Sequence, residues 1–322
     1  MKISLGIDSG GTFTDAVLID QETGSVLSSS KVYTTHEDLS TGIKKSIGAV
    51  LQSATSNNPV YPADVDLVGL STTLATNALV EGRRSPVCLI LLGYQPSLVD
   101  RYDFRKDFVT PDLVYVEGGH DSEGNEQATL NEEAIKEAVS RRNEVQAFAV
   151  SSYFSTRNPA HELRAMEIIE QVAAAVGRRV SVTCGCQLTD GLDSVRRAST
   201  AALNASLTPL LSTLILKVSE SLVGFGIVAP LMVVKGDGSL IRAELALSKP
   251  VETILSGPAA SLIGAMHLSG RQSACIVDVG GTTTDIVMLK DGRPKLNRSG
   301  ARVGRWRTMV ETADISTLGL GG

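Results

Sequence analysis

The sequence predicts an α/β protein built from two lobes. Three observations support this fold class: the chain has 322 residues, strand-like and helix-like segments alternate along it, and one glycine-containing motif occurs twice. A chain of this length usually divides its hydrophobic core between two lobes. Alternation of strands with helices is typical of layered α/β folds.

The repeated motif stands near both ends of the chain. Residues 6–18 read GIDSGGTFTDAVL and residues 276–288 read IVDVGGTTTDIVM, so at an offset of 270 residues both fit D-x-G-G-T-x-T-D-x-V. In each copy β-forming residues precede the glycines and an alternating run follows them. This pattern predicts a strand, a tight turn and a second strand.

Residue spacing predicts the elements between the two copies. Leu39, Ile43, Ile47 and Leu51 recur at helical intervals. The other predicted elements are strands over residues 65–70 and 87–92, helices over 158–176 and 192–222, and a polar loop excursion over 94–130 with a short strand near Val114. We place the boundary between the lobes after residue 187, so that residues 1–187 carry the first motif and residues 188–322 the second.

The glycine pairs predict phosphate binding. Without a Cβ atom, glycine lets backbone N–H groups approach phosphate oxygens, and the threonines that follow add hydroxyl donors. A single glycine pair could be only a turn, whereas two matching copies favour a clamp on the phosphates of ATP. The predicted phosphate contacts are Gly10, Gly11, Thr12, Thr14, Gly280, Gly281, Thr282 and Thr283.

One aspartate precedes each glycine pair. Asp8 and Asp278 carry charge that phosphate would repel unless a cation or water intervenes. We therefore predict that both are catalytic and hold Mg²⁺ through water, Asp8 mainly acting on the metal and Asp278 mainly on the attacking water. Asp15 and Asp285 either share this role or only bond neighbouring backbone.

The two motifs resemble the first and second phosphate motifs of the actin, Hsp70 and sugar-kinase superfamily. In wording, the chain is similar to the N-terminal region of the hydantoinase/oxoprolinase family. The segments that carry this resemblance are GIDSGGTFTDAVL, STTLATNALVEGR (71–83), NPAHELR (158–164), ETILSGPAASLIGA (252–265) and DVGGTTTDI (278–286). The resemblance implies a two-lobed ribonuclease H-like (actin-like ATPase) fold, and we expect the second lobe to be incomplete.

The resemblance also implies an activity. Members of this family use ATP to open or activate cyclic amides such as 5-oxoproline and hydantoins, or to drive related carboxylations. ATP phosphorylates an amide or enol oxygen, and the activated species then reacts. A similar glycine-rich turn in the family packs near the adenosine, which implies nucleotide contacts for Gly319 and Gly321. Because the chain stops there, we expect it to work with a second subunit or further C-terminal domains.

Three further residues are candidate substrate contacts. Thr73 and Asn77 follow a predicted strand and open a helix, where small polar residues cap the helix or face a ligand. Asp237 lies in the turn-like run Lys235–Ser239, which departs from the Ser-Asp-Gly-Gly usual in the family. Ser256 is interpreted as a helix cap near the nucleotide, since no general base for a nucleophile adjoins it.

The composition argues against two classes of partner, nucleic acid and membrane. A net charge of −5 and 4% aromatic residues argue against nucleic acid, and Arg302, Arg305 and Arg307 are interpreted as a solvated face or strand edge. No signal peptide opens the chain, and no run approaches a membrane span, so we expect a cytoplasmic protein without membrane contact. Three alternatives to the hydrolase stay open: a nucleotide-driven chaperone or reactivating factor, an ATP-dependent carboxylase subunit, and a small-molecule kinase.

Overall fold

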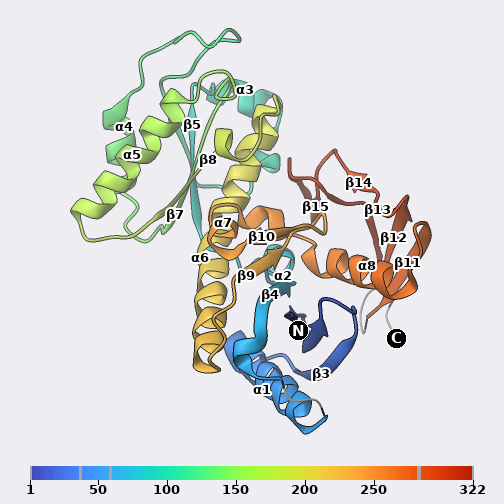
Figure 1. Ribbon diagram of the computed structural model, residues 1–322. Coiled ribbons are helices and arrows are strands. Elements are labelled where there is room, and N and C mark those ends of the chain that lie inside the picture. Colours follow the sequence, from blue (N-terminus) through green and yellow to red (C-terminus); the bar gives the residue numbers. More distant parts are fainter. Residues whose placement is uncertain (1, 36–37, 58–59, 281–283, 321–322) are drawn as a thin grey trace. The chain divides into compact units, whose positions relative to one another are not determined.

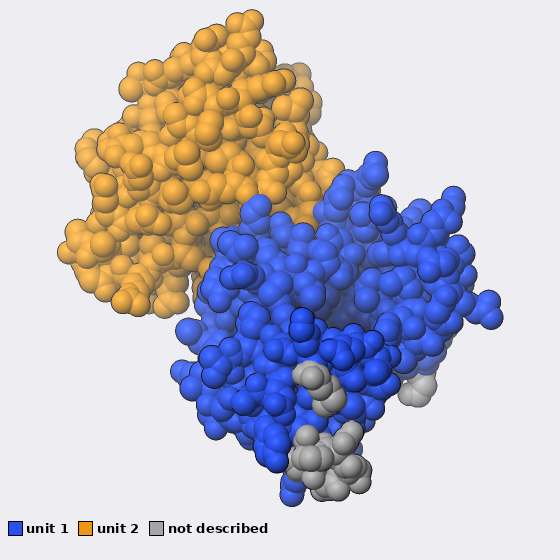
Figure 2. Space-filling model, viewed as in Figure 1, with its two compact units in different colours: residues 1–77, 211–298, 311–322 blue, residues 78–210, 299–310 orange. Residues whose placement is uncertain are grey.

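The computed structural model describes residues 2–35, 38–57, 60–280 and 284–320. The chain is a mixed α/β protein that separates into two compact units (Figure 2). Unit 1 comprises residues 1–77, 211–298 and 311–322, and unit 2 comprises residues 78–210 and 299–310. The units are interleaved in sequence, because helix α6 (Ser194–Gly224) belongs to unit 2 in its first part and to unit 1 in its last. A single boundary after residue 187 therefore does not describe these units.

The main sheet of unit 1 has six strands in the order β10-β9-β4-β1-β2-β3 (Figure 1). The strands are β1 (Ile3–Ser9), β2 (Phe13–Asp20), β3 (Val26–Tyr33), β4 (Val65–Thr72), β9 (Leu231–Val234) and β10 (Leu240–Arg242). Strands β1, β2 and β3 pair as antiparallel hairpins, whereas β4 runs parallel to β1, and β9 runs parallel to β4. The first repeat is therefore a hairpin, as predicted.

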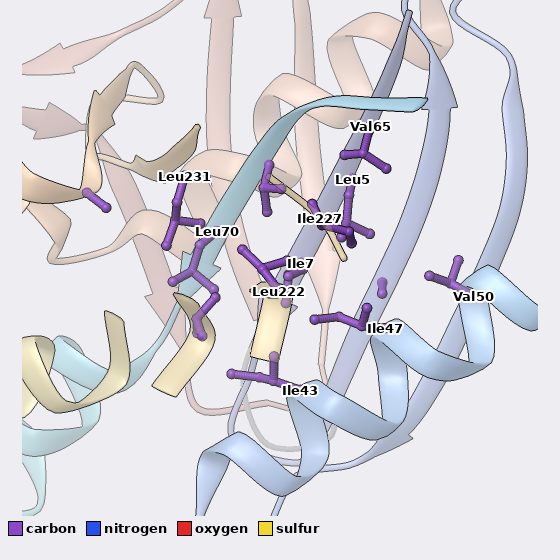
Figure 3. Close-up of a cluster of buried hydrophobic side chains, with 14 of the residues drawn as sticks. Leu5, Ile7, Ile43, Ile47, Val50, Val65, Leu70, Leu222, Ile227 and Leu231 are labelled. Atoms are coloured by element: carbon purple, nitrogen blue, oxygen red, sulfur yellow. The ribbon is translucent and has the colours of Figure 1, made fainter. Parts of the chain in front are cut away.

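The core of unit 1 lies between this sheet and helix α1 (Leu39–Asn57). Alternate residues of β1 are buried, and Ile43 and Ile47 of α1 face them at the predicted helical spacing (Figure 3). Leu222 from the end of α6 completes this cluster. A strand has a period of two, so burying one face of β1 leaves Gly6 and Asp8 on the other face.

A smaller sheet of unit 1 contains the second repeat. Strand β11 (Ala274–Val279) pairs with β12 (Thr284–Lys290), which also pairs with β13 (Arg293–Pro294) and β18 (Ile315–Leu318). Helix α8 (Ser256–Ser269) contacts β11 and β12, and it also contacts β4 and β9 of the main sheet. Unit 1 further contains α7 (Ala243–Ala246), the start of α2 (Leu74–Val80), the short pair β14 (Leu296–Asn297) and β17 (Thr312–Ala313), η1 (Pro62–Asp64) and η4 (Pro250–Thr253).

Unit 2 is built on a parallel sheet in the order β6-β5-β7-β8. Its elements are β5 (Val87–Leu92), β6 (Leu113–Val116), β7 (Ala147–Ser152), β8 (Ser181–Cys184), β15 (Arg302–Val303), β16 (Trp306–Arg307), α3 (Pro96–Arg101), α4 (Glu132–Ser140), α5 (Ala160–Ala175), η2 (Phe104–Asp107) and η3 (Gly185–Gln187). Every residue of β5 and β7 is buried, as is usual for central parallel strands. The strand predicted near Val114 is β6, which pairs with β5; the rest of the segment 94–130 holds α3, η2 and loops.

Helix α6 corrects the expectation that no segment approaches a membrane span. By length and composition alone it could cross a membrane, since an 18-residue window has a mean hydropathy of 1.4. Of that window, 61% is buried inside the structure, and a core helix meets the same criterion. Ala, Leu, Ile and Val raise the mean hydropathy of α6, while Ser, Thr and charged residues among them prevent a continuous apolar run.

Candidate functional site

The turn of the first hairpin is closed by its own backbone and by Thr34. The Gly10 N–H donates to the Phe13 carbonyl oxygen at 3.0 Å, and a Cβ on Gly10 would lie only 3.0 Å from that oxygen. Thr34 donates its N–H to the Thr12 oxygen and its hydroxyl to the Gly10 oxygen, both at 2.9 Å. Gly11 and Thr12 are exposed at the tip, where their N–H groups can meet a ligand.

Thr14 does not face the tip of the turn. Its side chain is fully buried, and its hydroxyl lies 3.0 Å from the Thr34 hydroxyl. Thr14 and Asp15 are adjacent in β2, so the pleat sends their side chains to opposite faces. The geometry therefore does not support the predicted contact of Thr14 with phosphate; its position supports the hairpin instead.

A row of polar residues crosses four strands on the face away from α1. Asp8 is the register partner of Ser71 on β4 and of Asp15 on β2, and Asp15 is in turn opposite Lys31 on β3. Lys31 Nζ lies 3.1 Å from Asp15 Oδ1. Two carboxylates thus stand side by side with a single ammonium at one end of the row.

Asp8 is the strained member of this row. Its Oδ1 atom is buried without a hydrogen-bond partner in the described structure, and so is the Ser71 hydroxyl. Burial raises the pKa of Asp8, and the neighbouring carboxylates of Asp15 and Asp278 raise it further, while Ser71 and Lys31 act in the opposite direction. A buried carboxylate that lacks partners is costly unless a cation or donor comes to it.

A cavity of about 560 Å³ lies over this row. Its floor includes Gly6 and Gly69, which are register partners on β1 and β4. A Cβ on Gly69 would meet nothing within 4 Å, so the space above this glycine is open. Val234 of β9 and Ala260 of α8 complete the walls, and the size falls within the range of small-molecule pockets.

The second hairpin has the register of the first. Asp278 is opposite Asp285, just as Asp8 is opposite Asp15. Asp278 and Gly280 are exposed, and the charge of Asp278 contributes to the raised pKa of Asp8. The predicted phosphate contacts Gly281, Thr282 and Thr283 lie outside the described residues.

The last described strand adjoins the second hairpin. Thr284 of β12 pairs with Leu318 of β18, and its hydroxyl donates to the Leu320 oxygen at 2.6 Å. Gly319 lies between these two contacts with open space around it. Gly321 lies outside the described residues. The segment predicted to hold the nucleoside is therefore next to the strand that follows the second turn.

Helix α8 is joined to the main sheet at its first residue. The Ser256 hydroxyl donates to the Thr72 oxygen at 2.8 Å, and Thr76 Oγ1 accepts the Leu255 N–H at 3.1 Å. Ser256 is fully buried and does not cap α8, whose cap residue is Leu255. The interpretation of Ser256 as a helix cap is thus wrong, because its hydroxyl donates a hydrogen bond from α8 to strand β4.

Thr73 and Asn77 lie beside the first turn. The Thr73 N–H donates to the Ser9 oxygen at 3.1 Å, and Asn77 Nδ2 donates to Thr73 Oγ1 at the same distance. A Cβ on Gly11 would lie 3.7 Å from Asn77 Nδ2. The Asn77 side-chain amide therefore lies beside the Gly10–Gly11 turn. The predicted substrate contact of Thr73 and Asn77 stays a prediction.

Asp237 is engaged in its own turn. Its Oδ1 accepts the Ser239 N–H at 2.9 Å and the Ser239 hydroxyl at 2.6 Å. Lys235 Nζ lies 3.4 Å from Asp237 Oδ2 and 3.0 Å from Glu252 Oε2. These contacts account for Asp237 as a turn residue and leave its predicted substrate role without support.

Sequence reasoning missed Ser71, Lys31 and the glycine pair Gly6 and Gly69. Gly6 and Ser71 each begin a recognised segment and Gly69 precedes one by two residues, so their signal is position in a strand next to a motif, whereas Lys31 lies outside every motif. That signal becomes specific only when the registers of four strands are known.

No group of three or more His, Cys, Asp or Glu side chains in the described part of the chain forms a metal cage. Mg²⁺ is usually held by one or two carboxylates together with water and phosphate, so a magnesium site does not require such a cage.

Comparison with known proteins decides the family. The family model of the hydantoinase/oxoprolinase N-terminal region matches residues 4–173, and that of hydantoinase/oxoprolinase matches residues 197–322. The chain belongs to the hydantoinase/oxoprolinase family. The resemblance drawn from the motifs is thereby confirmed.

Other members of the hydantoinase/oxoprolinase family are similar over nearly the whole chain. Caprolactamase subunit alpha from Pseudomonas jessenii is 30% identical over 99% of this chain and 48% of its own length. The solved structure of that ATP-dependent caprolactamase superposes with a TM-score of 0.77 over the same shares. The acetophenone carboxylase gamma subunit from Aromatoleum aromaticum is 26% identical over 99% of this chain and 47% of its own length.

The fold is shared with a carboxylase. A nucleotide-free structure of acetone carboxylase, 20% identical, superposes with a TM-score of 0.84 over 99% of this chain and 48% of that chain. At this identity the likeness shows the α/β fold alone. The chain spans about half the length of these relatives.

Proposed function

We propose that this chain supplies the ATP phosphate clamp of an enzyme that opens a cyclic amide of the 5-oxoproline, hydantoin or lactam class. The observation that carries the proposal is the matched register of Asp8 with Asp15 and of Asp278 with Asp285. Similarity to a caprolactamase subunit supports the cyclic-amide class. The chain would act with a second subunit or further domains, in the cytoplasm and without nucleic acid or membrane.

The sheet order supports a ribonuclease H-like, actin-like lobe. Three antiparallel strands β3-β2-β1 continue into the parallel strands β4 and β9, and the first phosphate turn joins β1 to β2. The second hairpin would form the opposite jaw, in a second lobe to which Gly280 and Gly319 belong. This assignment makes the 560 Å³ cavity over the polar row the neighbourhood of the nucleotide.

The residues of this site fit magnesium. The buried Asp8 Oδ1 lacks a donor, and Asp8 has two further carboxylates near it. We infer that Asp8 and Asp278 would hold Mg²⁺ through water and that the metal would neutralise phosphate charge. The exposed N–H groups of Gly11 and Thr12 would bind phosphate oxygens, and the Asp278 carboxylate would orient a water molecule.

In the proposed reaction the amide oxygen takes the γ-phosphoryl group of ATP and ADP departs. One water then adds to the activated ring carbon, and the carbon–nitrogen bond breaks as the nitrogen takes up a proton, which leaves an acyl phosphate. A second water hydrolyses this acyl phosphate to the carboxylate and free phosphate. Pre-positioning and charge neutralisation are the contributions that such a clamp makes to phosphoryl transfer.

ATP turnover of the full-length enzyme with its partner subunit tests the proposal. Caprolactam, 5-oxoproline and hydantoin are added singly, and one of them should raise turnover and appear as its ring-opened product. If none does, the cyclic-amide class is wrong.

A carboxylase subunit is the second candidate, favoured by the similarity to the acetophenone carboxylase gamma subunit. In this case turnover should rise only when a ketone and bicarbonate are supplied together. Stimulation by a protein alone would instead indicate the chaperone alternative, and a stable phosphorylated product would indicate a kinase.

A further inference from the structure

Unit 2 contains a cavity of about 620 Å³ that the proposed ATP site does not use. Aromatic and cationic side chains share its wall. They come from η2, the segment after β7, the start of α6 and the β15–β16 hairpin: Phe104, Tyr153, Arg196, Arg305, Trp306 and Arg307. Two of the three arginines that the sequence suggested to be a solvated edge therefore line this cavity.

Trp306 is held between two guanidinium groups. Those of Arg84 and Arg305 lie 4.9 Å and 5.0 Å from the centre of its ring. The Trp306 Nε1 atom is buried and has no hydrogen-bond partner in the described structure. A buried N–H without an acceptor is costly, so the position of this ring is not explained by hydrogen bonding among the described residues.

Positive charge accumulates around this ring. Arg305 and Arg307 form no ion pair within the described ranges. Burial and the charge of Arg305 lower the pKa of Arg84, so these two cations repel each other. The fully buried Arg197 donates to the carbonyl oxygens of Ser152 and Tyr153 at 2.6 Å, and it is not part of the cavity wall.

The acidic residues of the wall do not cancel this charge. Asp193 Oδ1 accepts the Arg196 N–H at 3.0 Å and so occupies the start of helix α6. That end of a 31-residue helix carries partial positive charge of its own. Asp193 Oδ2 also lies 4.0 Å from Arg196 Nε, which leaves Asp107 as the one carboxylate of the wall against Arg305 and Arg307.

We propose that the unit 2 cavity binds a small molecule that carries a carboxylate on a flat ring. The guanidinium groups of Arg305 and Arg307 match the planar, two-oxygen geometry of a carboxylate. Tyr153, Phe104 and Trp306 offer flat apolar surface to the ring. A cavity of this size is within the range of small-ligand sites.

The intrinsic tryptophan fluorescence of the chain comes from this cavity alone, because Trp306 is its one tryptophan. Emission of the intact chain excited at the red edge of tryptophan absorption is followed during titration with benzoate. Benzamide, the neutral compound of the same shape, is the control ligand, and inorganic phosphate tests for a simple anion site. We expect a saturable change with benzoate that weakens with added salt, and no comparable change with benzamide.

Two arginine variants distinguish binding in the cavity from nonspecific attraction to positive charge. Arg307→Gln should weaken benzoate binding about tenfold or more, as expected for loss of a charged hydrogen bond. Arg302→Gln, opposite Arg307 on the same hairpin but outside the cavity wall, should leave it unchanged. Calorimetry replaces emission for Arg305→Gln, because losing the guanidinium over the ring changes the emission itself.

Three results would overturn the proposal: equal binding of benzoate and benzamide, tighter binding of phosphate than of benzoate, or equal effects of Arg302→Gln and Arg307→Gln. Both arginines are exposed, so their loss should leave folding intact, which circular dichroism verifies.

Discussion

Asp8 and Asp15 lie directly opposite each other on β1 and β2, and only Asp15 of the two has an ion-pair partner in the described structure. Like charges at such cross-strand positions destabilise a sheet. The same opposition recurs between Asp278 and Asp285. The proposed Mg²⁺ site would offset this repulsion in both hairpins.

Replacing either leading aspartate should slow ATP turnover. Asp8→Asn and Asp278→Asn each keep the size of the side chain and remove its charge. In the full-length enzyme with its partner, the rate should fall by roughly 10²-fold or more, the effect of losing a positioned catalytic group. Steady-state ATPase rates across a Mg²⁺ titration measure this. Near-normal turnover and Mg²⁺ dependence in both variants would remove the basis of the clamp.

The same Asp8→Asn change should stabilise the chain when metal is absent. A carboxyl whose pKa is raised by folding disfavours the folded state at pH values above that pKa. The penalty shrinks as the pH falls below the raised pKa, and it vanishes below the ordinary pKa of the unfolded carboxyl, where the folded and unfolded chains are both protonated. Thermal melting in EDTA should thus show a higher midpoint for Asp8→Asn at pH 7, with a smaller difference in acid.

Asp66→Asn is the matched control for this stability test, since Asp66 is an exposed residue of β4 in the same sheet. Its midpoint should stay near that of the unchanged chain at both pH values. If Asp8→Asn melts at or below the unchanged chain at pH 7, the Asp8 carboxylate is not under strain.

Ser256→Ala should affect stability and spare chemistry. It removes the donor to the Thr72 oxygen and leaves that buried backbone group without its side-chain partner. We expect a loss of about 1–3 kcal/mol in the free energy of unfolding. ATP turnover of the folded enzyme should change only a few-fold. A complete loss of turnover in a variant that melts normally would instead assign Ser256 a catalytic role.

Gly236→Ala should be destabilising, because a Cβ there would lie 2.2 Å from the Ile254 oxygen and 2.7 Å from Thr312 Cγ2. Forcing atoms into such a gap costs about 1–3 kcal/mol. Gly264→Ala is the contrasting variant: it lies within α8, where a Cβ meets nothing within 4 Å. Alanine should there stabilise the helix by roughly 0.5–1 kcal/mol. Urea denaturation of both variants tests whether the two signs differ as expected.

Much of the local structure was predictable from residue order. Helix α1 follows from the spacing of Leu39, Ile43 and Ile47, and the helices predicted over 158–176 and 192–222 are α5 and α6. Both hairpins follow from β-forming runs on either side of a glycine pair. These features depend on backbone preferences and on periods of 2 and 3.6, which neighbouring residues specify.

The candidate site was predictable only in part, because side-chain direction depends on strand register. Thr12 and Thr14 look equivalent in the motif, yet Thr12 is exposed and Thr14 is buried against Thr34. Ser256 looks like a helix cap, yet its partner is Thr72, which is 184 residues away in the chain.

The sequence by itself therefore determined the repeat, the hairpins, the leading aspartates and the family. Only the tertiary structure decided that Asp8, Asp15, Ser71 and Lys31 form one row, and that the two compact units are interleaved along the chain. The physical reason is that the repeat and the hairpins arise from contacts between residues close in sequence. The row and the units arise from pairing and burial between distant segments, whose register no local pattern encodes.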